Sequence, residues 1–268
     1  MPELTLPDLT LHYEVDGDGP PLLLLAGMLS DSATWAGFTP LLSDHFTVIR
    51  PDNRTTGRTV PRDAPADVVH MIADALALMD HLGHGAFHVA GHSLGGLMSL
   101  ELAALMPERV ATVGVFASGR IRVPRTMAVF DALLAIRRAP QGERLWLQAL
   151  HPWIFGNGFF EDADATRTAI VAALGYPHMQ TVDAMALQIE AFRAFRPKAR
   201  MAEIACPTLV AYAGQDLLVP PALAQPSFAN LPDLHEVTFP DAGHSIVWDA
   251  PDALADHLLH FLGKHPIR

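Results

Sequence analysis

The sequence predicts an α/β fold in which a mostly parallel, doubly wound sheet carries an inserted block of helices. Short apolar runs alternate with segments of helical periodicity along residues 1–120, and strands that alternate with helices pair in parallel. From residue 121 to about residue 200 the pattern is helical throughout, and the alternation resumes at Pro207. We therefore expect residues 1–120 and 201–268 to form the sheet core and residues 121–200 to form a helical cap.

Two kinds of pattern define the elements of the first 120 residues. Leu9–Val15 alternates apolar and polar residues like a half-exposed strand. Pro21–Ala26 is a continuous apolar run, which is typical of a strand buried on both faces. Asp67–Leu82 has apolar residues at helical spacing and ends before Gly83. The other elements share these patterns, with strands expected at His45–Arg50, Ala86–Ala90 and Val110–Ala117 and a helix at Leu94–Met106.

The second half of the chain completes the core after the expected cap. The helical stretches of the cap are Val129–Arg138, Glu143–Leu150, Ala165–Leu174 and Val182–Phe195. Beyond it we expect strands at Pro207–Ala213 and His235–Phe239 and a last helix at Pro251–Leu262. Charge also separates the two parts. The cap has ten basic and seven acidic residues, whereas the remainder has eight basic and 22 acidic ones.

The composition excludes several classes of protein. Half of the 268 residues are hydrophobic, which excludes a disordered chain and suits one large core. The net charge of −11 makes nucleic acid and anionic membranes poor partners. The single cysteine, Cys206, excludes an intramolecular disulfide, and we interpret it as a core residue. Because the sequence contains neither a signal peptide pattern nor an apolar run of the roughly 20 residues that span a membrane, we expect a cytoplasmic protein.

The segment Gly91–Gly95 matches the pattern G-x-S-x-G, with Ser93 at its centre. It lies between an expected strand and an expected helix, which is the setting of the sharp turn that exposes a nucleophilic serine. Glycines suit such a turn because the neighbouring chains approach too closely for side chains. We therefore predict that Ser93 is a nucleophile, with an ordinary glycine-rich turn as the alternative.

A serine nucleophile needs a base and a carboxylate that orients the base. Asp216 and His244 each follow an expected strand, so both lie at the edge where open α/β sheets place their sites. We predict a catalytic triad of Ser93, Asp216 and His244. Three nearby residues are interpreted as supporting, turn or cap residues, namely His92, Asp241 and Asp249.

This arrangement resembles the α/β-hydrolase superfamily over essentially the whole chain. Within it, the chain is similar to capped serine esterases, enol-lactonases and cofactor-free haloperoxidase-like enzymes. The matching pieces are Leu22–Met28, Gly91–Gly96, Gly214–Pro220 and Gly243-His244. The resemblance implies the α/β-hydrolase fold, and it implies an oxyanion hole made by the backbone N–H groups of Met28 and Leu94.

The chain departs from the family pattern in the loop Asp52–Thr59. The family usually has the sequence D-x-R-G-x-G-x-S there, and this chain has Thr55 and Thr59 in place of the first glycine and the serine. The shape of this wall of the site is therefore left open by the sequence.

The hypothesis is a serine hydrolase that cleaves a small carboxylic ester or lactone through an acyl-enzyme. No metalloprotease, P-loop or dinucleotide motif is present in the sequence, so neither a metal nor a cofactor is expected. Alternatives on the same triad are a carbon–carbon bond hydrolase, a thioesterase or carrier-protein esterase, and a perhydrolase. An alternative of another class is a ligand receptor or stress regulator that retains a slow triad. The oligomeric state is not predicted.

The expected cap suggests two properties of the substrate site. Some of its large apolar residues are expected to line the pocket and the others to pack against the core: Trp146, Trp153, Phe155, Phe159, Phe160, Tyr176 and Met179. Its positive charge suggests an anionic substrate, attracted by Arg122, Arg125, Arg137, Arg138, Arg193, Arg196 and Arg200. The alternative is that these arginines pair with core carboxylates such as Asp74 or Glu108.

Overall fold

One sheet of eight strands runs through residues 2–267, which are the residues that the computed structural model describes. Met1 and Arg268, the outermost residues of the predicted core, lie outside them. The strand order is β1-β2-β4-β3-β5-β6-β7-β8, in which β2 pairs antiparallel with both β1 and β4 and the remaining neighbours pair in parallel. The strands are β1 (Glu3–Thr5), β2 (Thr10–Asp16), β3 (Pro21–Leu25), β4 (Thr47–Pro51), β5 (Phe87–His92), β6 (Val110–Phe116), β7 (Thr208–Ala213) and β8 (Leu234–Phe239). The predicted mostly parallel α/β fold is confirmed.

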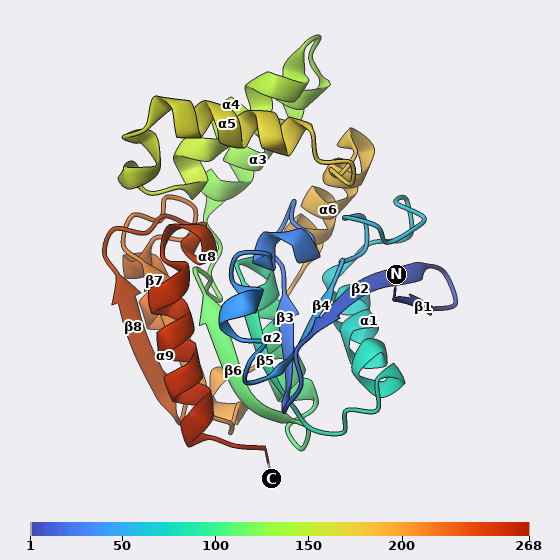
Figure 1. The fold of residues 1–268 in the computed structure, drawn as a ribbon, viewed down its shortest axis with the longest axis vertical. Coiled ribbons are helices and arrows are strands. Elements are labelled where there is room, and N and C mark those ends of the chain that lie inside the picture. Colours follow the sequence, from blue (N-terminus) through green and yellow to red (C-terminus); the bar gives the residue numbers. More distant parts are fainter. Residues whose placement is uncertain (1, 268) are drawn as a thin grey trace.

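Helices cover both faces of the sheet (Figure 1). The helices of the core are α1 (Val68–His81), α2 (Leu94–Leu105), α7 (Pro221–Ala224), α8 (Ile246–Asp249) and α9 (Pro251–Lys264). Strand β3 shows how the two faces are filled. Leu23 and Leu25 pack into the apolar cluster that includes α1 and α2, whereas Leu22 and Leu24 pack into the cluster that includes α9. The continuous apolar run of β3 is thus explained, because side chains that alternate in direction enter a core on either face.

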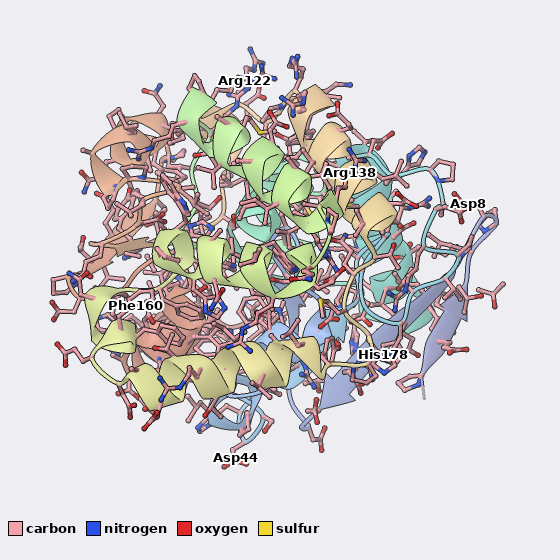
Figure 2. All side chains as sticks on the ribbon, turned by 90° about the horizontal axis from the view of Figure 1, so that it is seen from above. Asp8, Asp44, Arg122, Arg138, Phe160 and His178 are labelled. Carbon is pink, nitrogen blue, oxygen red and sulfur yellow. The ribbon has the colours of Figure 1, made fainter. Side chains whose placement is uncertain are left out.

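Four longer helices follow β6 in the sequence and precede β7. They are α3 (Pro124–Arg138), α4 (Gly142–Ile154), α5 (Ala163–Leu174) and α6 (Val182–Ala194), and we call residues 121–200 the helical segment. The segment lies over the edge of the sheet at which the parallel strands end (Figures 1 and 2). It has an apolar cluster of its own, built around Leu133, Leu147, Met185 and Ile189.

Short helical turns complete the connections. The 3₁₀ turns are Ser32–Trp35, Thr39–Leu41, Asn157–Phe160, Met201–Glu203 and Gln225–Phe228. The sequence patterns did not predict these turns or β1, because elements of three or four residues are too short to display a period. Within residues 2–267 no helix has the length and apolar character needed to cross a membrane.

Candidate active site

Ser93 occupies a sharp turn between β5 and α2. Its backbone has φ 54° and ψ −116°, a conformation that is costly for a residue with a side chain. The turn requires glycine on both sides. A Cβ on Gly91 would lie 2.1 Å from the backbone of Gly95, and a Cβ on Gly95 would lie 1.9 Å from the carbonyl oxygen of Leu25. The spacing of the glycines is therefore a consequence of backbone packing around the serine.

The neighbouring strand β6 holds this turn in place. The Ser93 N–H donates to the carbonyl of Phe116 at 2.9 Å, and the Ser118 hydroxyl donates to the carbonyl of Ser93 at 2.6 Å. Both contacts fix the strained backbone from the side of the sheet. The role of Ser118 was not predicted, since a single serine after a strand has no distinctive sequence signal.

The structure brings Ser93, His244 and Asp216 together at the carboxyl ends of β5, β8 and β7. His244 Nδ1 lies 2.8 Å from Asp216 Oδ2, and His244 Nε2 lies 2.9 Å from Ser93 Oγ. Because an ionised carboxylate can only accept, Nδ1 carries the proton and donates to Asp216. Nε2 of the neutral ring is then free to accept the hydroxyl proton of Ser93. His244 and Asp216 are only 5% and 3% exposed.

Asp216 is held by its own loop. Its Oδ1 accepts hydrogen bonds from the backbone N–H groups of Leu218 at 2.8 Å and Val219 at 2.7 Å. These bonds orient the second oxygen, Oδ2, toward the histidine. The carboxylate is consequently buried with hydrogen-bond donors on both oxygens, as a buried charge requires.

His92 supports His244 from the side of the sheet. Its Nε2 lies 2.7 Å from the carbonyl oxygen of His244, so Nε2 carries the proton and donates. Burial, with a smaller contribution from the nearby His244, lowers the pKa of His92 to about 3. The ring is therefore neutral in the physiological range and acts as a fixed donor to the backbone that carries His244. This contact agrees with the supporting position expected for His92.

Asp249 joins the His244 loop to the helical segment. Its Oδ2 accepts from the N–H groups of Gly243 at 2.7 Å and Gly156 at 2.8 Å. Burial raises the pKa of this carboxyl, and the two N–H groups oppose that rise. The prediction of a turn or cap residue missed this bridge, because Gly156 is distant in sequence. The backbone of Ser245 also donates to the carbonyl of Ile154 at 2.6 Å.

The backbone N–H groups of Met28 and Leu94 lie next to Ser93 and donate to no protein acceptor within residues 2–267. Leu94 directly follows the serine in the chain. A Cβ on Gly27, which precedes Met28, would lie 3.1 Å from the Cβ of Ser93. An oxyanion hole requires two such donors, and the assignment of this role to Met28 and Leu94 stays a prediction.

A pair of buried glutamines from the helical segment reaches this loop. Gln188 is completely buried, and its Oε1 accepts from the N–H of Leu29 at 2.8 Å. Gln180 Nε2 lies 3.3 Å from the same oxygen and 3.1 Å from Thr55 Oγ1. Leu29 and Thr55 both have positive φ angles, 64° and 72°. The two glutamines therefore stabilise two strained loops beside Ser93, a role that the sequence analysis did not predict.

Both residues at which the loop Asp52–Thr59 departs from the family pattern take part in hydrogen bonds that hold the loop. Thr55 adopts the left-handed conformation that glycine would adopt more easily. Its hydroxyl bonds to Gln180, and the Thr59 hydroxyl donates to the carbonyl of Asp52 at 2.7 Å. Asp52 is fully buried and accepts from the N–H groups of Ser32 and Arg58, both at 2.8 Å.

Two cavities meet at Ser93. One, which we call the aromatic chamber, has a volume of about 450 Å³ and lies between His244 and the helical segment. Of the seven large apolar residues singled out in the sequence, five line it: Trp146, Phe155, Phe159, Tyr176 and Met179. Trp153 instead lies beneath the guanidinium of Arg125, and Phe160 packs on Phe159 at the surface. The aromatic chamber also contains Asp31, which accepts from the Tyr176 hydroxyl at 2.9 Å.

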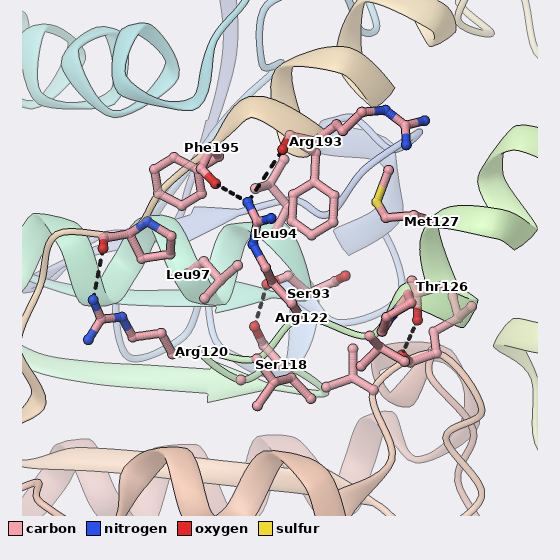
Figure 3. A pocket seen from close by; sticks show the side chains of 18 residues that line it. Ser93, Leu94, Leu97, Ser118, Arg120, Arg122, Thr126, Met127, Arg193 and Phe195 are labelled. Atoms are coloured by element: carbon pink, nitrogen blue, oxygen red, sulfur yellow. Dashed lines mark hydrogen bonds between the residues drawn. The ribbon is translucent and has the colours of Figure 1, made fainter.

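The other cavity, which we call the arginine chamber, has a volume of about 470 Å³ and lies between the β6–α3 connection and the end of α6. Figure 3 shows the residues that line it, among them Ser93, Leu94, Arg120, Arg122 and Arg193. Of the residues that the structure describes, only Ser93 and Leu218 line both chambers. Each volume suits a small-molecule group.

The arginines of the helical segment do not pair with Asp74 or Glu108, the two core carboxylates named in the expected alternative, although Arg200 pairs with Glu203 of the predicted core. Asp74 is buried against Arg54, whose Nε and Nη2 lie 2.5 Å and 2.9 Å from its oxygens. Arg54 also binds Asp8. Within the described part of the chain, Glu108 forms no ion pair.

Most of these arginines instead bind groups of the helical segment or its flanking loops. Backbone carbonyls of the segment accept from Arg122, Arg137 and Arg196, whereas Arg125 donates to the carbonyl of Leu217 in the core loop that carries Asp216. Carboxylates accept from Arg193 and Arg200, and Arg137 also pairs with Glu143. Of the seven, only Arg122 and Arg193 line a chamber that reaches Ser93.

Comparison with known proteins gives concordant matches. The model of the "Alpha/beta hydrolase family" matches residues 22–257. A protein of Azorhizobium caulinodans named "Putative carbamate hydrolase RutD" is 32% identical over 265 residues, which is 96% of this chain and 96% of that protein. The enol-lactonase from Burkholderia xenovorans LB400 is 25% identical with a TM-score of 0.85, covering 98% of this chain and all of that chain. A thermophilic esterase from Thermogutta terrifontis shares the fold, with a TM-score of 0.83, 24% identity and coverage of 96% of this chain and 95% of that chain.

Proposed function

Because the chain belongs to the α/β-hydrolase family, we propose that it is a serine hydrolase that cleaves a small carboxylic ester or lactone through an acyl-enzyme. The observation that carries this proposal is the unbroken hydrogen-bonded series from Asp216 through His244 to Ser93. Its protonation pattern leaves Nε2 of His244 as the acceptor beside the serine hydroxyl. Residues 121–200 act as the cap over this site.

In the first half of the proposed reaction, Ser93 Oγ attacks the substrate carbonyl while His244 Nε2 takes the hydroxyl proton. Asp216 holds the ring and stabilises the imidazolium that forms. The N–H groups of Met28 and Leu94 donate to the oxygen that becomes negative. Such a donor stabilises the transition state by about 3–4 kcal/mol. Collapse of the tetrahedral intermediate breaks the bond to the alkoxy oxygen, which receives the proton from His244; an ester then releases its alcohol, whereas a lactone opens to a hydroxyacyl group that stays on Ser93.

In the second half, water hydrolyses the ester bond between Ser93 and the acyl group. His244 accepts a proton from this water, and the hydroxide equivalent adds to the acyl carbonyl. The same two N–H groups stabilise the second oxyanion. The acid then leaves and Ser93 recovers its proton from His244, so the triad ends in the protonation state in which it began.

A carbamate is a second candidate substrate, because the relative from Azorhizobium caulinodans carries the name of a carbamate hydrolase. A carbamate carbonyl accepts the same attack by Ser93, although its nitrogen makes that carbonyl less electrophilic. Comparing kcat/KM for a small aryl ester and for the aryl carbamate of the same size separates the two candidates. A higher value for the carbamate would favour the second one.

Replacing Ser93 with alanine tests the proposed nucleophile. We expect Ser93→Ala to lower kcat for a small aryl ester by about 10⁴-fold or more, because the attacking atom is lost. Ser99→Ala is the matched control. Ser99 lies on α2, the helix that begins directly after Ser93, and within residues 2–267 its hydroxyl donates only to the carbonyl of Gly95. Near wild-type turnover by pure Ser93→Ala protein would disprove the serine mechanism.

The same assay separates an enzyme from a receptor with a slow triad. An enzyme releases product at a steady rate over many turnovers, whereas a receptor releases about one product per chain and then stops. We expect steady turnover. Thioester, carbon–carbon and peracid substrates tested beside the ester distinguish the remaining alternatives that use the same triad.

A further inference from the structure

The two chambers that meet at Ser93 differ in charge. Among the residues that line the arginine chamber there are three arginines and no aspartate or glutamate. The lining of the aromatic chamber includes Asp31 and no lysine or arginine. A substrate that occupies both chambers therefore meets a positive environment on one side of the scissile bond only.

Arg120 and Arg122, unlike Arg193, pair with no carboxylate within residues 2–267, and Arg120 donates to the carbonyl of Pro197 at 2.8 Å. Arg193 is neutralised by Asp131 at 2.5 Å and Glu190 at 3.1 Å. Arg122 Nη2 donates to the carbonyl of Phe195 at 3.2 Å, with the carbonyl of Arg193 at 3.5 Å (Figure 3). Within residues 2–267 its Nη1 and Nε have no hydrogen-bond acceptor, and no carboxylate pairs with it. Arg122 thus keeps both its charge and part of its planar set of donors for a ligand.

Most of the other side chains that line the arginine chamber are apolar, and Ser118 and Thr126 are polar exceptions. The apolar ones include Leu97, Ile121, Met127, Phe192 and Val219. An alkyl chain fits such walls, and a negative group at its end would meet Arg122. A guanidinium binds a carboxylate through two parallel hydrogen bonds, which makes this pairing more specific than a single charge contact.

We propose that Arg122 binds a carboxylate on the substrate, so that the enzyme prefers esters or lactones whose alkyl chain ends in a carboxylate. This inference rests on the proposed function, and it narrows the substrate class. The bond to the carbonyl of Phe195 gives Arg122 a second role, because it closes the carboxyl end of α6. The experiment must therefore separate recognition of the ligand from support of the helix.

Two matched probes make this separation. The probes are the para-nitrophenyl ester of pentanoic acid and the para-nitrophenyl monoester of glutaric acid. Both acyl chains have five carbon atoms, but the pentanoate chain ends in a methyl group and the glutarate chain ends in a free carboxylate. We expect the wild type to prefer the glutarate ester. In Arg122→Gln, kcat/KM for the glutarate ester falls about tenfold or more, as expected for a lost hydrogen bond to a charged group, and the pentanoate ester is hardly affected.

Two further variants complete the comparison. Arg122→Lys retains the charge without the planar donors and keeps part of the preference. Arg138→Gln is the control for net charge, because Arg138 is the last residue of α3 and lines neither chamber (Figure 2). Raising the salt concentration from about 0.01 M to about 1 M shortens the screening length from roughly 30 Å to roughly 3 Å and reduces the preference.

The outcomes are distinguishable. The inference is wrong if the glutarate ester has no advantage in the wild type, or if Arg122→Gln slows both esters equally, which is the result of a purely structural role. Calorimetric titration with glutarate gives an answer that does not depend on turnover. If the wild type binds glutarate about tenfold or more tightly than Arg122→Gln does, the inference is supported even when neither ester is cleaved. In that case the proposed function alone has failed.

Discussion

Asp216 uses its two carboxylate oxygens for different tasks, since one accepts from its own loop and the other from His244. Replacing it with asparagine separates these tasks. The amide oxygen can still accept from Leu218 and Val219, but the amide nitrogen would face Nδ1 as a donor. His244 would then carry its proton on Nε2 and could not accept from Ser93.

We therefore expect Asp216→Asn to lower kcat by about 10⁴-fold while the protein stays folded. Asp241→Asn provides the control, because Asp241 is exposed and precedes His244 by three residues. Steady-state kinetics and a thermal unfolding curve for both variants provide the measurement. A loss of less than about tenfold in Asp216→Asn would show that the orientation of the histidine does not depend on this carboxylate.

At the scale of secondary-structure elements, helix α6 controls the loop that carries the proposed oxyanion donor Met28. Gln188 accepts from the N–H of Leu29, which directly follows this donor. In Gln188→Leu the N–H of Leu29 loses its acceptor, and the loop with its positive φ angle loses a restraint. Misplacement of a catalytic group by about 1 Å can cost about 10²-fold. We expect kcat to fall by about 10- to 100-fold with little change in KM.

Two further variants test whether Gln188 acts as a positioning residue. Gln188→Glu preserves an oxygen that accepts from Leu29, so it should recover much of the lost kcat. Gln148→Leu makes the same change on the exposed side of α4 and should have wild-type kinetics. If Gln188→Leu changes the unfolding temperature but not kcat, Gln188 serves stability alone.

At the scale of the whole molecule, buried histidines make the stability depend on pH. His88 is 1% exposed in the central strand β5, with Nδ1 at 2.9 Å from the hydroxyl of Thr112. Burial, with a smaller contribution from His265, lowers the pKa of His88 to about 4. Between pH 6.5 and about 4 the unfolded chain therefore binds a proton that the native protein does not bind. Stability consequently falls as the pH decreases through this range.

One such histidine accounts for about 1.4 kcal/mol of unfolding free energy per pH unit where only the unfolded state is protonated. We expect His88→Gln to have a shallower decline between pH 6.5 and pH 4.5 than the wild type. Urea unfolding at several pH values measures how the free energy of unfolding changes with pH. His257→Gln is the control, because His257 is exposed. Equal slopes in the wild type and His88→Gln would mean that His88 is protonated in the native state as well.

The sequence could predict those parts of the molecule that depend on short segments. The glycines around Ser93 are dictated by backbone contacts of the turn itself, and Asp216 and His244 each follow a recognisable strand. The role of Gln188 could not be predicted, because its partner Leu29 is 159 residues away in the sequence. The sequence of a helix also does not indicate which of its polar side chains is buried. The pairing of Asp74 with Arg54 was missed for the same reason, since it depends on how α1 packs against a distant loop.

Among the described residues the two chambers share only Ser93 and Leu218, which has a consequence for the order of events in the turnover of an ester. If the acyl group of the acyl-enzyme occupies one chamber and the alcohol occupied the other, departure of the alcohol empties a space beside the ester bond on Ser93. Water that enters this space reaches the acyl carbonyl without displacing the acyl group.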